Sequence, residues 1–184
     1  MLRIALLKNP ACESCAPANQ IQHNFVVLRG IHIHAQSFES DGGQWFDVAP
    51  ELAAIPREFD LIGDSLPDWV TPSTILPAGT YDFARLQFSR DNASNPAHCG
   101  AGVVNCLILK DGRIAALGFA SDASELVIQL TNNAKPLLVL PNTTSELHIR
   151  LHPRTRTPAW LSFGDAPPVE LAGEVATEGV VHPD

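Results

Sequence analysis

The sequence predicts an all-β fold, an antiparallel β-sandwich with few or no helices, formed by a single domain over residues 1–184. Fifteen prolines and twelve glycines are spread along the chain and divide it into many short segments, as the turns of a sandwich do. Several of these segments are rich in β-branched and aromatic residues, or alternate apolar and polar positions. No segment has the apolar spacing of a convincing amphipathic helix. The length of 184 residues, 45% of them hydrophobic, is enough for one sizeable core.

The first half of the chain predicts strands at residues 2–7, 25–35, 44–48 and 59–62. The second of these has strong β propensity, and Gly30 is placed for a bulge. Asp41-Gly42-Gly43 predicts a hairpin turn before the third strand, because glycine takes positive φ without steric cost. The strand at 59–62 is expected to follow a short helical turn.

The segment 76–88 carries the clearest local signal. Pro77 fixes φ at about −65° for the second position of a turn, and Gly79 is expected in the left-handed conformation behind it. Tyr81 then opens a strand that also contains aromatic residues. Its ring could be buried with the hydroxyl returned to the backbone, as in the tyrosine corner of immunoglobulin-like sandwiches. The alternative is an ordinary half-buried tyrosine in a strand.

The second half predicts strands at residues 105–109, 113–119, 126–130, 135–140, 145–152, 160–163 and 169–171. Asp111-Gly112 lies between the first two and predicts the tip of a hairpin. In the strand at 145–152, Leu147, Ile149 and Leu151 alternate with polar residues, so we expect these three side chains to face the core.

Charge and hydropathy exclude two classes of function. The formal net charge is −8, and Lys and Arg are not clustered as nucleic-acid binding requires. No apolar run approaches the roughly 20 residues of a transmembrane helix. We therefore expect no nucleic-acid partner and no membrane-spanning helix.

The four cysteines fall into two close pairs, Cys12 with Cys15 and Cys99 with Cys106. In an exported chain an even number of cysteines predicts disulfides, here two local ones, although four cysteines allow three connectivities. A zinc site made of all four is the rival interpretation, but the spacing of the second pair is too wide for a zinc knuckle. A redox motif at Cys12-Glu13-Ser14-Cys15 lacks the surrounding βαβ pattern.

Several turns and strand starts carry a resemblance to a known family. The segments concerned are Asn9-Pro10, 26–34, 43–48, 59–61, 76–81, 84–86, 109–112 and 146–151. In these the chain resembles the bacterial and archaeal lipoprotein ectodomains known as domain of unknown function 4382, which have prealbumin-like β-sandwich kinship. It departs from them at Lys8-Asn9-Pro10, where the family usually has an acidic residue before alanine and proline. The resemblance implies an exported sandwich, often lipid-anchored outside the membrane, with no catalytic residues to carry over.

The expected location is extracytoplasmic, in the periplasm or at the cell surface. Residues 2–7 are too short an apolar stretch for a signal peptide, and Lys8 and Pro10 interrupt it. Asn9-Pro10-Ala11-Cys12 is a poor lipidation site. A leader or lipid anchor would therefore lie outside the sequence given, and any contact with a membrane would depend on it.

No motif for catalysis is found, whether nucleophile elbow, metalloprotease helix, P-loop or dinucleotide fingerprint. We therefore expect a non-catalytic module without a cofactor that binds an envelope protein or polysaccharide, or else a structural brace in an envelope assembly. A metal-binding protein is a further alternative. His32 and His34 share one face of a strand and could bind one metal ion, and His148 and His152 would add to the site if the two strands were neighbours.

Trp69 is the predicted ligand-binding residue, because it lies in a loop-like, proline-flanked segment and could offer its ring to a sugar. Trp45, in the middle of a strand, is assigned to core packing instead. The loop at 90–106 is a second candidate for contact with a partner.

Overall fold

The computed structural model describes residues 1–8, 21–35, 43–63, 68–71, 73–90, 98–100, 103–118, 124–132, 135–154, 169–177 and 182–183. Among these residues there is one helix, the short α1 (Glu51–Ala54). The strands are β1 (Leu2–Leu7), β2 (Ile21–Ala35), β3 (Gln44–Asp47), β4 (Arg57–Asp60), β5 (Asp68–Trp69), β6 (Gly79–Phe88), β7 (Cys106–Leu109), β8 (Ile114–Gly118), β9 (Glu125–Gln129), β10 (Thr131–Asn132), β11 (Lys135–Val139), β12 (Thr143–Arg154), β13 (Val169–Thr177) and β14 (His182–Pro183).

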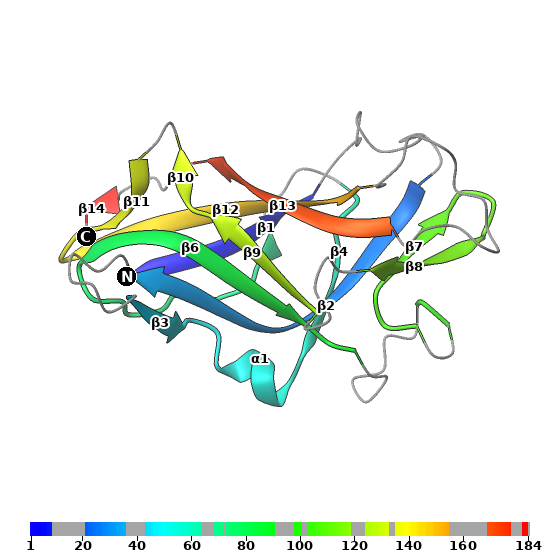
Figure 1. Ribbon diagram of the computed structural model, residues 1–184, viewed down its shortest axis with the longest axis horizontal. Helices are drawn as coiled ribbons and strands as arrows, with labels where there is room; N and C mark the ends of the chain where they lie inside the picture. Colours follow the sequence, from blue (N-terminus) through cyan, green and yellow to red (C-terminus); the bar gives the residue numbers. More distant parts are fainter. Residues whose placement is uncertain are drawn as a thin grey trace.

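The strands form two sheets, which confirms the predicted all-β sandwich. The first sheet is built around β2 and β6, which pair with each other and with β3, β4, β7, β9 and β11. The second has the order β13-β12-β1-β5. The hydrogen-bonded path runs from one to the other through β8, which pairs with both β7 and β13 (Figure 1). Most ladders are antiparallel, but β1 with β12 and β8 with β13 are parallel, which the predicted antiparallel sandwich did not include.

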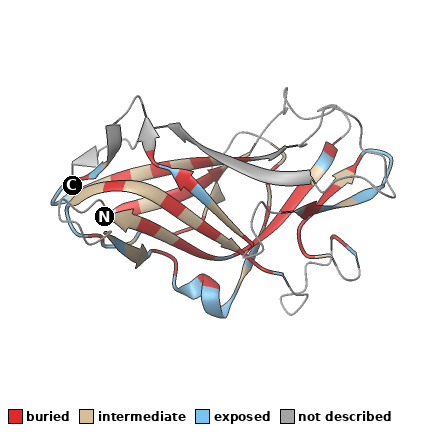
Figure 2. Cartoon of the chain, in the orientation of Figure 1, coloured by how far each residue is buried: buried red, intermediate tan, exposed pale blue. Residues whose placement is uncertain are grey.

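The core lies between the sheets and follows the alternation of the strands. Burial alternates along β6 and β12 in Figure 2. Leu147, Ile149 and Leu151 have exposed fractions of 0–1% and belong to the main apolar cluster, so the predicted inward face of β12 is confirmed. They meet side chains of the first sheet such as Ile33 and Leu86, both at 0%.

Two predicted hairpins are present. β3 pairs antiparallel with the end of β2, and α1 precedes β4 as expected.

β7 and β8 are joined by a turn in which Gly112 has φ +84° and its N–H donates to the carbonyl of Leu109. At the same turn the backbone N–H of Arg113 donates to Asp111, which holds the pKa of that carboxyl below its usual range. The bulge predicted at Gly30 corresponds to a register shift between Leu28 and Gly30 in the β2–β6 ladder.

The tyrosine corner is formed. Tyr81 has an exposed fraction of 1%, and its hydroxyl donates to the carbonyl oxygen of Pro77 at 2.7 Å. Gly79 differs from the prediction, since it does not take the left-handed conformation. It is the first residue of β6 and pairs with Val139 of β11, so its backbone is part of the sheet. The hydrogen bond from the Tyr81 hydroxyl to Pro77 therefore connects the turn to the strand. The prediction relied on a left-handed Gly79 to form this turn.

Tyr81→Phe is expected to lower the free energy of unfolding by about 1 kcal/mol, the usual net value of one hydrogen bond. Burial also raises the pKa of the Tyr81 phenol. The protonated phenol of Tyr81 therefore contributes fully to stability below the ordinary tyrosine pKa of about 10. This contribution is lost as the pH rises through the higher pKa that the phenol has in the folded protein. Urea unfolding at a series of alkaline pH values, with and without Tyr81→Phe, measures both effects.

Absorbance of tyrosinate gives the control, because the chain has a single tyrosine. The phenol should ionise at higher pH in the folded protein than in urea. Ionisation at the same pH in both would contradict a buried, hydrogen-bonded Tyr81.

Three predictions lie outside the described residues. These are the Cys12–Cys15 disulfide, the tip of the β2–β3 hairpin before Gly43, and the strand at 160–163.

Candidate functional site

One outer surface of the first sheet gathers aromatic and charged side chains, and we call it the β2–β6 face. Successive side chains of a strand point to opposite sides of a sheet. Ile31 and Ile33 of β2 are fully buried in the core, so His32 and His34 lie on the outer side. The residues that make up this face are His32, His34, Trp45, Phe83, Arg85, Gln87 and Glu125.

Trp45 has a fixed position on the β2–β6 face. It is half-buried, and β3 pairs it directly with His34. The guanidinium carbon of Arg85 lies 4.1 Å from the centre of the indole, a cation–π contact. The imidazole of His34 is 4.9 Å away between ring centres, tilted by 49°. These two contacts set the plane of the indole.

The polar side chains beside Trp45 hold one another in place. Gln87 Nε2 donates to Glu125 Oε1 at 2.8 Å, and Glu125 Oε2 lies 3.8 Å from Arg85 Nε. The two strands that carry these residues are paired, with residues 83–87 of β6 opposite residues 125–129 of β9. Amide, carboxylate and guanidinium groups are thus oriented before any ligand arrives, which reduces the entropy lost on binding.

His34 is oriented by a carboxylate. The β2–β6 ladder shifts register between His34 and Ala35, so Asp82 is an extra residue between Tyr81 and Phe83. His34 Nδ1 donates to Asp82 Oδ1 at 2.6 Å. Gly43 packs against the opposite nitrogen of the ring, where any β-carbon would overlap His34 Nε2, and its φ of +73° also favours glycine.

His32 and Arg85 are direct partners across the β2–β6 ladder, and each has a buried nitrogen without a hydrogen bond. Among the described residues, neither His32 Nδ1 nor Arg85 Nε has a hydrogen-bond partner. Most buried polar atoms in proteins do have one. Because both nitrogens are buried, a ligand could reach them only if neighbouring side chains moved.

The metal hypothesis is supported only in part. His32 and His34 do share a face, as predicted. β12, which carries His148 and His152, lies in the other sheet and does not pair with β2, so the condition under which these histidines would add to the site is not met. No group of three or more His, Cys, Asp or Glu side chains in the described ranges is arranged to hold a metal ion.

Trp69 lies on the outer side of the second sheet. It belongs to the short strand β5 and is half-buried, whereas the sequence predicts a loop and an exposed ring. The guanidinium carbon of Arg3 lies 3.9 Å from the centre of its indole, and the His148 ring meets it edge-on at 5.7 Å. Arg3 in turn forms a 3.0 Å ion pair with Glu146. We call Arg3, Trp69, Glu146 and His148 the Trp69 cluster.

Trp45 is the residue that the sequence assigns wrongly. It lies outside the apolar core, whereas its neighbour Phe46 packs against that core. In a strand of four residues, alternation separates Trp45 and Asp47 from Phe46 but does not say which side is inside. The partner strand supplies that information: Trp45 opposes His34 and Phe46 opposes Ile33, which is buried.

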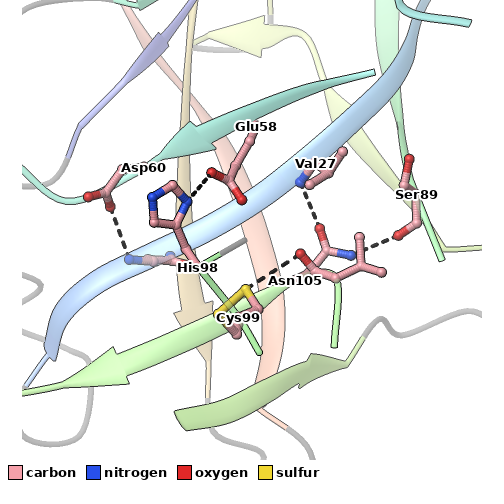
Figure 3. Close-up of a disulfide and its surroundings, with 10 residues drawn as sticks. Val27, Glu58, Asp60, Ser89, His98, Cys99 and Asn105 are labelled. Atoms are coloured by element: carbon pink, nitrogen blue, oxygen red, sulfur yellow. Dashed lines mark hydrogen bonds and ion pairs between the residues drawn. A yellow bond between two sulfur atoms is a disulfide. The ribbon is translucent and has the colours of Figure 1, made fainter. Parts of the chain in front are cut away.

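A disulfide and side-chain hydrogen bonds fix the segment that carries the second cysteine pair beside β2 (Figure 3). Cys99 and Cys106 form a disulfide and are 2% and 0% exposed. Next to it, the buried side chain of Asn105 accepts from the backbone N–H of Val27 and donates to the carbonyl of Ser89, each at 2.8 Å. This end of the 90–106 segment is therefore fixed to the sheet, although the sequence predicts a loop for contact with a partner.

Two histidines stack on the faces of Phe25 beside this disulfide. The ring centres of His23 and His98 lie 5.2 and 4.5 Å from that of Phe25, with interplanar angles of 16° and 17°. Each Nδ1 donates to a carboxylate of β4, Asp60 and Glu58 respectively, at 2.6 Å. The stack closes the small apolar cluster around Cys99 and Cys106.

No family model, no curated protein and no solved structure matches this chain. The resemblance seen in its turns and strand starts therefore remains an expectation. Within the described residues, no helix has the length and apolar character to cross a membrane.

Proposed function

We propose that the chain is a non-catalytic module that binds polysaccharide, and that the β2–β6 face is its binding surface. The observation that carries the proposal is Trp45, an indole held in a fixed plane by Arg85 and His34. The C–H face of a sugar ring stacks on such a surface with little loss of side-chain entropy. The fixed carboxylate, amide and guanidinium groups of Glu125, Gln87 and Arg85 can bond the hydroxyl groups around the ring.

The position of the site on paired strands also supports the proposal. Binding groups on strands are held more precisely than groups on loops. A sheet surface is open at both ends, which suits a chain of sugars better than an isolated small molecule.

An extracytoplasmic location is part of the proposal. The disulfide between Cys99 and Cys106 supports it, because such bonds persist mainly outside the reducing cytoplasm. The expected partners are then polysaccharides of the envelope or its surroundings.

Trp45→Ala is expected to weaken polysaccharide binding by about tenfold or more, as the loss of a central aromatic contact does. A glycan array identifies a ligand for the wild type, and titration calorimetry with that glycan then gives the dissociation constants. Trp69→Ala is the matched control, since Trp69 has the same kind of arginine and histidine contacts on the opposite sheet.

The two possible failures are distinguishable. If the wild type binds no glycan, the proposed function is wrong. If it binds and Trp45→Ala binds equally well while circular dichroism shows a folded variant, the β2–β6 face is not the site. Loss of binding in Trp69→Ala alone would move the site to the Trp69 cluster, where the sequence predicts it.

A further inference from the structure

Four exposed apolar side chains gather at one end of the sandwich, which we call the apolar end. Their exposed fractions are 84% for Ile75, 49% for Leu138, 41% for Met1 and 40% for Leu140. Single exposed apolar side chains are ordinary on a protein surface, whereas a group of them marks a site of contact. The other exposed large apolar side chains in the described ranges belong to three different elements, and they are Ile55, Ile114 and Val127.

Backbone pairing brings the four residues of the apolar end together from three separate segments. Leu138 of β11 pairs with the start of β6. At the start of β12, a backbone N–H donates to the carbonyl of Met1 at 2.8 Å. Leu2 and Thr74 exchange two backbone hydrogen bonds of 2.7 and 2.8 Å, which places Ile75 next to the start of β1. β1, β6 and β12 all begin at this end and run away from it (Figure 1).

The apolar end is also uncharged along the two segments that form most of it. Residues 73–80 and 136–145 contain no Asp, Glu, Lys, Arg or His, although charged residues make up 17% of the whole chain. The ammonium group of Met1 already has a partner, because it donates to the carbonyl oxygen of Thr143. Charged side chains are the groups whose transfer into hydrocarbon costs most free energy. The side chains of these two segments can therefore enter an apolar medium without burying a charge.

The size and composition of the apolar end favour a lipid surface over a second protein. A stable protein–protein interface buries about 800 Å² on each partner and usually has aromatic or arginine side chains at its centre. Four partly exposed apolar side chains provide less area, and neither segment 73–80 nor segment 136–145 contains an aromatic residue or an arginine. Insertion into lipid needs no complementary surface, because each buried apolar group contributes on its own.

We propose that the apolar end binds the surface of a lipid bilayer, with Ile75, Leu138 and Leu140 at the boundary between headgroups and acyl chains. The hydrocarbon of four side chains is comparable with that of one acyl chain, so binding is weak and reversible. The net charge of −8 opposes approach to anionic lipid, so the preferred surface is zwitterionic. This contact needs no lipid anchor, and it does not depend on the polysaccharide site.

Vesicles of phosphatidylcholine test the proposal with the full chain. At millimolar lipid, part of the wild-type protein should sediment with the vesicles, and added salt should not release it. Ile75→Asp should lower the partition coefficient about tenfold, because it removes an apolar side chain from the lipid and introduces a charge. Ile55→Asp is the matched control and should bind as the wild type does. Ile55 is 74% exposed at the C-terminus of α1, which lies away from the apolar end (Figure 1).

Ile75→Trp makes the opposite change. Tryptophan favours the membrane interface, so this variant should bind several-fold more tightly than the wild type. Because the Ile75 side chain is exposed, both substitutions should leave the fold intact, which circular dichroism checks. Absence of wild-type protein from the vesicle pellet, or equal binding of Ile75→Asp and Ile55→Asp, would overturn the proposal. A dimer in sedimentation equilibrium that Ile75→Asp abolishes would also overturn it, since a second copy would then cover the apolar end.

Discussion

Asn105→Leu is expected to lower the free energy of unfolding by about 3 kcal/mol, because it leaves two buried backbone groups without a hydrogen bond. The amide of Asn105 bonds the N–H of Val27 and the carbonyl of Ser89, and thereby connects the start of β7 with β2 and the end of β6. Leucine has a similar volume and can satisfy neither group. Urea unfolding followed by circular dichroism measures the loss.

Asn24→Leu is the matched control. Asn24 is also fully buried, but neither atom of its amide has a hydrogen-bond partner among the described residues. The same substitution there removes an unsatisfied polar group from the core, so we expect stability to be unchanged or higher. Equal losses in the two variants would show that side-chain shape, and not hydrogen bonding, determines the effect at Asn105.

Removal of the described disulfide is expected to have an effect of similar size. The double variant Cys99→Ala with Cys106→Ala should lose about 2.5 kcal/mol of unfolding free energy, the value expected for closing so short a loop. The sequence separation of the two cysteines is 7. Because His98 precedes Cys99, the variant should also loosen the stack on Phe25.

Hydrogen exchange separates this local effect from a global one. Backbone amides at 103–106 should lose protection in the double variant more than amides of β12 in the other sheet. The wild-type disulfide should resist reductant in the native protein and be reduced readily in urea, since both cysteines are buried. Rapid reduction without denaturant would contradict a buried, structural bond.

The parts of the fold that follow from local sequence were predictable. The alternation of 145–152 predicts the buried side of β12, and Asp111-Gly112 predicts the β7–β8 turn, because both signals lie within a few residues. The bond between Tyr81 and Pro77 spans four residues and belongs to the same class. Gly79 was misassigned because pairing with β11, which is far away in sequence, decides its backbone.

The candidate site depends on pairings that leave no local signal. Trp45 joins the β2–β6 face because β3 pairs with β2 and Arg85 reaches it from β6. His32 is where alternation predicts it, but its pairing with Arg85 and the unbonded nitrogens of both depend on the β2–β6 register. The separation of His34 from His148 likewise follows from the assignment of strands to sheets, which residue spacing does not encode.

The parallel ladder of β1 with β12 also sets an order of events in folding. Arg3 and Glu146 are 143 residues apart, so this contact closes a very long loop and contributes to slow folding. A ribosome releases β1 long before it releases β12. Throughout that interval an apolar strand is without its β12 partner, and the second sheet is completed only when β12 and then β13 have emerged.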